Sequence, residues 1–317
     1  MADSLLTLAE VVHFNDVSIA DMGASDVFND APFLASLNAI IASHGSNHQF
    51  LKEVSAPAVG FRQPGAGRDH GKSADQLTTV GLSILDASFH VEKALAKNQR
   101  RGIDWFMARE AKRHIRAAFS HGEKQLFYGT DNDADGFNGL ADELNDLDHA
   151  MVIAAGTPAA SQNCTDVWAV RSTDDERFLS VCVGHDGEIE ISESYEQMLD
   201  GSNSKKRNVI VQPIEGWAGL VMHSAKSVAR LANIDDSDSK LTDALLYRLW
   251  ELFDENNPPT QLVMNKRSGR QLRESRVATT ESGKEVPLPK EWEGIPIVYS
   301  KSVGYYTTAN AVPQTAA

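Results

Sequence analysis

The sequence predicts a mixed α+β protein, and three observations lead to that prediction. A strongly amphipathic helical pattern runs from 102 to 128, two extended segments flank a glycine-rich stretch at 64–75, and strand and helix patterns alternate from residue 150 onward. Helical and strand periodicities are distinct signals, so their succession indicates both kinds of element in one fold.

The composition is ordinary for a globular protein of 317 residues, with 42% hydrophobic residues and a net charge of −14. A chain of this length can bury one large core or two smaller ones. The acidic balance argues against a basic nucleic-acid-binding module. No apolar run reaches the roughly 20 residues of a membrane span, and MADSLLTLAEVV lacks the basic start of a secretory signal. We therefore expect a protein made in the cytosol without a membrane partner.

The first 45 residues read as small apolar pieces without a core of their own. We expect a short helix at 4–12, irregular chain after it, and a second short helix at 32–42 with Pro32 in its first turn. Such pieces indicate an arm that lies on another surface.

Residues 48–63 and 76–95 read as the two strands of a long β-hairpin, with the second turning helical near its end. Its glycine-rich tip includes Gly71-Lys72-Ser73, which suggests a phosphate-binding loop. That loop requires a glycine five residues before Gly71, where the chain has Ala66, and a strand-to-helix context that is missing here. We interpret the stretch as a flexible tip. A long two-stranded hairpin is marginal alone in water, so it needs a partner surface.

The clearest helix is 102–128, where apolar residues recur at helical spacing: Ile103, Phe106, Met107, Ala111, Ile115, Ala118 and Phe119. The other side of this helix is basic, with Arg109, Lys112, Arg113 and Arg116. Three interpretations remain open for this basic side. It is solvated charge, a contact between subunits, or a surface facing packaged DNA.

The segment YGTDNDADGFNGLADEL (128–144) contains half of a calcium-loop pattern. Asp131, Asp133 and Asp135 precede Gly136, as in that motif, but the twelfth position holds Asp142 instead of a bidentate glutamate. An acidic solvated turn is the preferred interpretation, with Asp131, Asp133, Asp135 and Asp142 as weak candidates for a metal site.

From residue 150 the sequence predicts strand–turn–strand at 167–184, a polar mobile insertion at 194–208, extended chain at 209–224 and an amphipathic helix at 240–255. A strand followed by a basic turn or helix is expected at 260–275, and a final strand at 294–307. Cys164 and Cys182 lack metal-ligand spacing, so free buried thiols are expected.

No catalytic constellation is visible in the sequence. The ten histidines are scattered, and the serine-hydrolase, zinc-protease and dinucleotide signatures are missing. His114 and His121 share a face of the long helix without a third ligand nearby in sequence. We expect no enzyme activity, no catalytic residues and no cofactor.

The order of arm, hairpin, long helix and mixed α/β region resembles that of the major capsid proteins of tailed bacteriophages with the Hong Kong 97 type fold. Five segments resemble the short-tailed-phage, gp-seven-like branch of these coat proteins. They are LTLAEVV, QLFYGT, FNGLADEL, SVARLANI and PTQLVMNKRSGRQL.

This resemblance implies a set of named parts. The first two are an N-terminal arm at 1–45 and an E-loop hairpin at 46–95. A P-domain follows at 96–150, which contains the spine helix at about 102–128 and is completed by strands at about 290–317. An A-domain covers mainly 151–289. The tip at 61–73 is then the end of the E-loop, and the acidic segment after the spine helix is an ordinary connection.

The resemblance further implies a shell of hexamers and pentamers around double-stranded DNA, formed as a procapsid. The implied partners are other copies of the chain, a scaffolding protein, a portal, DNA bound non-specifically and, optionally, a decoration protein. The implied location is the virion, after assembly in the bacterial cytoplasm. No covalent cross-link is predicted.

The candidate inter-subunit contacts are Arg62, Arg68 and Lys72 on the E-loop and Arg109, Arg113 and Arg116 on the helix. Two alternatives remain: an encapsulin-like compartment with the same fold, and a cytosolic enzyme whose site is spread over loops.

Overall fold

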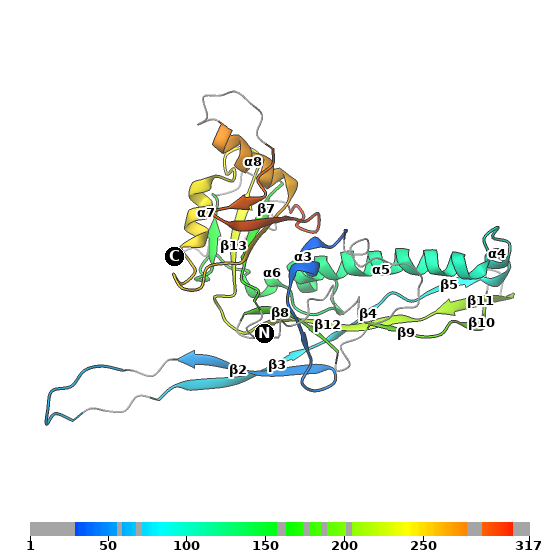
Figure 1. The fold of residues 1–317 in the computed structure, drawn as a ribbon, viewed down its shortest axis with the longest axis horizontal. Coiled ribbons are helices and arrows are strands. Elements are labelled where there is room, and N and C mark those ends of the chain that lie inside the picture. The colour runs from blue at the N-terminus through cyan, green and yellow to red at the C-terminus, as the bar shows by residue number, and fades with distance from the viewer. Residues whose placement is uncertain are drawn as a thin grey trace.

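A computed structural model describes residues 29–55, 59–67, 72–156, 163–173, 178–184, 189–200, 205–277 and 287–306. The molecule is elongated (Figure 1). A hairpin projects at one end, a long helix runs toward the other end beside strands, and a compact sheet with two helices rises from the middle. Within the described residues the strands form four sheets. No described helix is long and apolar enough to cross a bilayer.

The long helix α5 (Ile103–Tyr128) confirms the prediction for 102–128. Its buried face includes Ala111, Ile115, Phe119 and Leu126, which follow helical spacing. Short helical elements flank or contact it: α3 (Pro32–Ser36), α4 (Lys93–Lys97), η1 (Gly129–Asp131) and α6 (Leu140–Glu143).

A three-stranded antiparallel sheet runs beside α5. It contains, in order, β10 (Tyr195–Asp200), β11 (Lys206–Gln212) and β5 (Phe89–Glu92). The predicted mobile insertion at 194–208 is therefore wrong where the chain is described, because it forms the β10–β11 hairpin. Pairing with β5, more than a hundred residues earlier, supplies the partner that orders it.

A five-stranded sheet connects the helix to the projecting hairpin. Its strands are β1 (Ala39–Ile41), β4 (Ser83–Asp86), β8 (Leu179–Val183), β9 (Ile189–Ile191) and β12 (Ile214–Met222). The helix predicted at 32–42 is wrong in its second half, because β1 pairs in parallel with β8. The strands predicted at 167–184 were expected to pair with each other, but β7 (Thr165–Val170) and β8 lie in different sheets.

The projecting hairpin is shorter than the one predicted at 48–63 and 76–95, because residues 83–86 and 89–92 pair with β12 and β11 in other sheets. β2 (Asn47–Ser55) and β3 (Ala74–Gly81) are antiparallel, with an irregularity between Glu53 and Ser55. At its base Phe50 and Val80 pack on a small core that contains Leu82, Cys182 and Val221. The rest of the hairpin extends beyond the body (Figure 1).

A six-stranded sheet forms the compact part, in the order β15 (Glu291–Trp292), β16 (Ile295–Tyr299), β14 (Gln261–Met264), β7 (Thr165–Val170), β13 (Val228–Ile234) and β6 (Val152–Ala154). Every residue of β7, β13 and β14 is buried, as expected for strands covered on both faces. Helices α7 (Asp243–Trp250) and α8 (Lys266–Val277) accompany this sheet.

The predicted domain boundaries stay a prediction, and the sheets cross them. Strands β8, β9 and β12 share a sheet with β4, while β10 and β11 pair toward β5. Much of 189–222 is therefore built into the same layer as 83–92. The helix predicted at 4–12 lies outside the described residues.

A buried charged network joins the centre of the six-stranded sheet to residue 306. Arg230 on β13 lies 2.8 Å from the Asp166 carboxylate on β7, and both side chains are almost completely buried. The Tyr306 hydroxyl donates to the other oxygen of Asp166 at 2.6 Å, and burial, followed by the charge of Asp166, raises the Tyr306 pKa. Arg230 also donates to the Leu144 carbonyl at 2.8 Å and lies over the Trp168 ring.

A second buried carboxylate connects three distant segments. Glu123 on α5 is fully buried, and its Oε2 accepts from the backbone N–H groups of Phe33 at 2.8 Å and Leu34 at 3.0 Å. The Ser300 hydroxyl donates to its Oε1. This single side chain thus fixes the start of α3 and the turn after β16 on the long helix.

Gly129 ends α5 in a conformation that favours glycine, with φ +50° and ψ −126°. A Cβ there would lie 2.2 Å from the backbone nitrogen of Gly139 and 1.8 Å from Oδ2 of Asp142. We expect Gly129→Ala to lower the free energy of unfolding by more than about 2 kcal/mol in urea titrations of the unassembled chain, since strain and overlap add. Gly294→Ala is the matched control, because φ is +79° but no atom lies within 4 Å of the Cβ. Equal losses in the two variants would contradict the role of the overlap.

Candidate functional site

The projecting hairpin presents one face to solvent. Alternation along a strand places Leu51, Leu77 and Asp75 on the side opposite Phe50, which packs toward the body. Leu51 and Leu77 are directly paired in the register and are 69% and 59% exposed. The next rung pairs Asp75 with Glu53, so two acidic residues occupy it. We call Leu51, Leu77, Asp75 and the register position of Glu53 the hairpin face.

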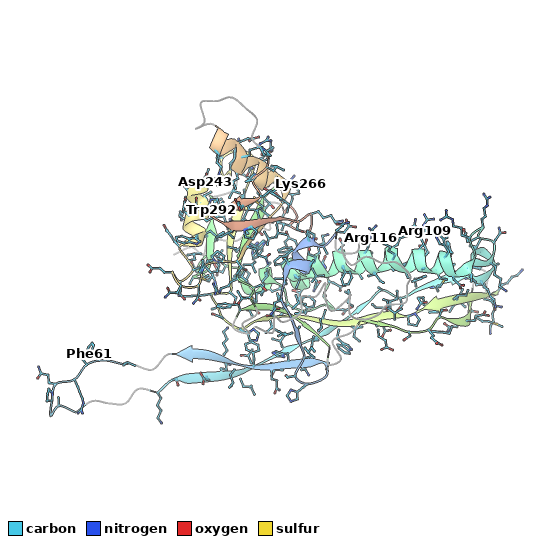
Figure 2. The ribbon with its side chains drawn as sticks, in the orientation of Figure 1. Phe61, Arg109, Arg116, Asp243, Lys266 and Trp292 are labelled. Atoms are coloured by element: carbon cyan, nitrogen blue, oxygen red, sulfur yellow. The ribbon has the colours of Figure 1, made fainter. Side chains whose placement is uncertain are left out.

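The tip of the hairpin holds the cations predicted to make contacts. Arg62 donates to the carbonyl of Ala66 at 2.9 Å, so its guanidinium steadies the turn at 64–65. Lys72 is exposed just before β3, and Arg68 lies outside the described residues. Phe61 is fully exposed, and it lies far from the body of the molecule in Figure 2.

The basic side of α5 forms an exposed stripe at four-residue spacing. It consists of Arg101, two residues before the start of α5, and of Trp105, Arg109 and Arg113 on the helix. The guanidinium carbons of Arg101 and Arg109 lie 4.9 and 5.5 Å from the centre of the Trp105 ring, in cation–π geometry. Arg113 also forms an ion pair with Glu110 at 2.7 Å. Within the described residues Arg109 pairs with no carboxylate. We call these four residues the helix stripe.

Arg116 serves a different contact from Arg109 and Arg113. Figure 2 shows Arg109 and Arg116 on the same outer side of α5, but Arg116 lies near the segment that leads into α3. A hydrogen bond from Lys301, at 2.7 Å, lowers the pKa of Asp30, and the nearby charge of Arg116 lowers it further. Arg116 therefore already has an acidic neighbour within its own chain.

The acidic segment after α5 satisfies its own hydrogen bonds. Oxygens of Asp142 accept from the backbone and hydroxyl of Thr130 and from the Gly139 backbone, at 2.9–3.1 Å. The backbone N–H of Asp135 and then His121 lower the pKa of Asp133, while Asp131 and Asp135 are exposed. Among the described residues, which include all four predicted candidates, no group of three potential ligands could hold a metal ion. The weak metal candidate at these four residues therefore stays a prediction.

A groove of about 280 Å³ opens between α5, β12 and the acidic segment. Its lining includes Phe119, Phe137 and Trp217, with the pair of His121 and Asp133 at 3.2 Å. His114 instead stacks on Phe89 at 4.7 Å, so the two helix histidines serve different neighbours. Cys164 and Cys182 are buried free thiols, as predicted, and burial raises the pKa of Cys182 to about 12.

The structure does not bring the two sets of predicted contact residues together in one chain. The hairpin tip and the helix stripe lie toward opposite ends of the molecule (Figure 2). Sequence reasoning missed Leu51, Leu77, Asp75 and Trp105. The first three could have been found from the alternation within the predicted hairpin, and Trp105 from its spacing to Arg109.

The chain is similar to known proteins over most of its length. Residues 25–268 match the family described as Major capsid protein GP7. No curated protein matches.

Two solved structures illustrate the similarity of fold. The chain aligns with a chain of bacteriophage Epsilon15 at a TM-score of 0.61 and 15% identity, covering 88% of each chain. It aligns with a chain of the bacteriophage JBD30 capsid decorated with minor capsid protein trimers at a TM-score of 0.51 and 13% identity, covering 88% of this chain and 92% of that one. At such identities these likenesses establish the fold.

Proposed function

Because this chain belongs to the GP7 family of major capsid proteins, it is a coat subunit of an icosahedral phage shell with the Hong Kong 97 type fold, and we propose that it assembles as hexamers and pentamers around double-stranded DNA. The family match covers 25–268, and that observation carries the proposal. The coat is a structural protein and not an enzyme.

The separation of the molecule into a compact body and a projecting hairpin fits the role of a coat subunit. A projecting hairpin with an exposed apolar rung contributes little to the core of its own subunit. A segment that becomes ordered only on a neighbouring subunit adds contact area, but ordering it costs conformational entropy. Each contact between subunits therefore stays weak enough for assembly errors to be reversed. We assign the N-arm, E-loop, P-domain and A-domain on this basis, with the boundaries given above.

The candidate contacts between subunits are basic. We propose that Arg62, Arg68 and Lys72 act at the E-loop tip, and that Arg109 and Arg113 act on the helix. Arg116 is the weakest member of the set, because its charge lies near Asp30 in the same chain.

The remaining partners follow from the proposed shell. They are a scaffolding protein and a portal during procapsid assembly in the host cytoplasm, DNA held without sequence preference, and optionally a decoration protein. The net charge of −14 is compatible with enclosed DNA, because counterions screen surface charges beyond about 10 Å.

We expect closed shells when the chain is expressed together with its phage neighbours and studied by negative-stain electron microscopy after size exclusion. Nucleic acid inside the particles would support a phage coat, and a co-purifying cargo enzyme without DNA would support the encapsulin-like alternative. If the scaffold is supplied and only monomers or small oligomers form, the shell is contradicted. The family match favours the phage coat over both alternatives.

A further inference from the structure

We propose that the groove between α5, β4, β12 and the acidic segment after α5 is a binding site for a small amphipathic cation, an amine that carries one aromatic ring or a short hydrocarbon chain. The whole groove lies within a single chain. The inference therefore goes beyond the coat function and does not depend on the proposed shell.

Small residues on two facing surfaces leave this groove open. The pairing of β4 with β12 places Ser83, Gly216 and Ala218 on one face of their sheet. Gly122 on α5 lies opposite, where an added Cβ would be 3.6 Å from the Leu85 side chain. The open volume of about 280 Å³ is close to the lower end of the range for small-molecule sites, which begins at about 300 Å³. The space thus suits a small ligand.

The acidic wall of the groove is held in place before any ligand arrives. Gln125 is buried on α5, and its Nε2 donates to the carbonyl oxygens of Asp133 at 3.0 Å and Phe137 at 2.8 Å. Its Oε1 accepts from the Asn132 side chain at 2.8 Å. One amide group therefore fixes the acidic segment against the helix. A preformed site binds its ligand without the cost of ordering a loop.

The charge of the groove is complementary to a cation. The described residues that line it include three carboxylates, Asp86, Asp133 and Asp135, but neither lysine nor arginine. Asp133 has His121 at 3.2 Å, whereas neither Asp86 nor Asp135 forms an ion pair within the described part of the chain. Hydrogen bonds from Ser88 lower the pKa of Asp86, so this carboxyl is ionised at neutral pH. The groove therefore offers unpaired negative charge to a ligand.

The remaining lining is apolar and includes aromatic rings. Phe119, Phe137 and Trp217 line the groove, and Trp217 is 40% exposed. Aromatic rings attract an ammonium group as well as a hydrocarbon body. Apolar walls with a few charged groups are typical of sites that bind and orient small molecules. The matching ligand has an apolar body for the walls and a positive head for the carboxylates.

The chain itself brings no suitable cation to the groove at either end. Residues 1–28 contain acidic residues but neither lysine nor arginine, and residues 307–317 contain no charged residue. Repulsion from the carboxylates disfavours the leading segment as an occupant, and a second copy carries the same net charge of −14. A free amine meets the charge requirement without either cost.

Three probes that share one apolar body test the charge requirement. Phenylbutylamine, phenylbutanol and phenylbutanoate are titrated at neutral pH into the unassembled full chain, and isothermal titration calorimetry measures each Kd. We expect the amine to bind with a Kd below about 1 mM. The alcohol should bind at least about fivefold more weakly, and the carboxylate most weakly of all. Added salt should weaken the amine and leave the alcohol unchanged.

Charge variants test which carboxylates hold the amine. Asp86→Asn with Asp135→Asn should weaken the amine at least about fivefold and leave the alcohol within about twofold, because the apolar walls are unchanged. Asp104→Asn with Asp238→Asn is the matched control. It makes the same charge change at exposed positions outside the groove, so the affinity for the amine should stay that of the wild type.

A groove-filling variant tests the location. Ala218→Leu places a larger side chain in the groove and should remove the binding of amine and alcohol alike. A second measurement covers the case in which this variant folds poorly. Saturating amine should raise the urea midpoint of the wild type more than that of the variant with Asp86→Asn and Asp135→Asn, since a ligand that binds only the folded state stabilises it.

Several results would overturn the site. Equal affinities for the three probes, or an unchanged affinity for the amine after Asp86→Asn with Asp135→Asn, would show that the charge is not recognised. A full chain that binds no amine would show that the groove has another occupant, and a dimer that the amine disperses would identify that occupant as a second copy. The coat function stands in each of these cases, because shell formation is measured separately.

Discussion

Arg230→Met is expected to lower the free energy of unfolding of the unassembled chain by about 3–5 kcal/mol. The substitution removes the 2.8 Å ion pair to Asp166 and leaves that fully buried carboxylate with only the Tyr306 hydroxyl as its described side-chain donor. A buried carboxylate without a cation lowers the free energy of unfolding by more than the ion pair adds to it, because neither water nor a cation reaches the charge. The shift of the urea midpoint, followed by tryptophan fluorescence, measures the loss.

The double variant Arg230→Met with Asp166→Leu is the control for this prediction. It removes both charges, so most of the penalty should disappear even though the pair is gone. A double variant that is less stable than Arg230→Met would show that the favourable pair, and not the isolated charge, dominates. Tyr306→Phe should cost less than Arg230→Met, because Arg230 still compensates Asp166.

Glu123→Leu is expected to destabilise the chain by about 2–4 kcal/mol, because the Phe33 and Leu34 N–H groups and the Ser300 hydroxyl lose their shared acceptor. Glu123→Gln keeps an amide oxygen for the two N–H groups and offers an N–H to Ser300, so it should be much less harmful. Urea midpoints of the two variants and the wild type at one pH make the comparison, and equal losses would contradict the hydrogen-bonding role.

The same pair of variants carries a pH prediction. Burial raises the pKa of Glu123, and this effect outweighs the hydrogen bonds from Ser300 and the α3 backbone, which lower the pKa. Between the ordinary carboxyl pKa near 4.3 and the raised pKa of the folded chain, the folded chain holds a proton that the unfolded chain has released. The contribution of this group to stability is complete below that ordinary pKa and is lost as pH rises through the raised value. Stability relative to Glu123→Gln should fall across this window, and parallel curves would contradict the raised pKa.

Local signals were sufficient for the elements whose own sequence pattern already matches the structure that they adopt. The apolar spacing from Ile103 to Phe119 determined α5 to within one residue at its start, and the glycine-rich stretch between two β-branched segments identified the β2–β3 hairpin. The strand and basic helix at 260–275 were likewise found as β14 and α8. In each case the nearest-neighbour pattern and the tertiary contacts favour the same structure.

The failures lie where a distant strand decides the outcome. Residues 194–208 are polar and lack a buried face, but β5 pairs with β11 and turns them into a hairpin. Residues 39–41 continue an apolar run that is compatible with a helix, but parallel pairing with β8 makes them a strand. No window of local sequence contains either partner.

The candidate site divides in the same way. Arg109 and Arg113 are visible in sequence because they repeat on one side of a helix, whereas the hairpin face depends on a register that only the structure supplies. Glu123 gave one signal that could have been used, since it interrupts the apolar face between Phe119 and Leu126. Asp166, Arg230 and Tyr306 are separated by up to 140 residues, and nothing in their local surroundings links them.

The positions of Ser300 and Tyr306 have a consequence for synthesis. Residues 300–306 leave the ribosome after every other described residue, yet Ser300 completes the Glu123 contact on α5 and Tyr306 completes the Asp166 contact in the central sheet. A nascent subunit can form its helix and hairpin early, but its compact part is closed only after residues 300–306 have emerged. A chain whose synthesis stops before residue 300 therefore lacks both contacts, and the core of its compact part stays open.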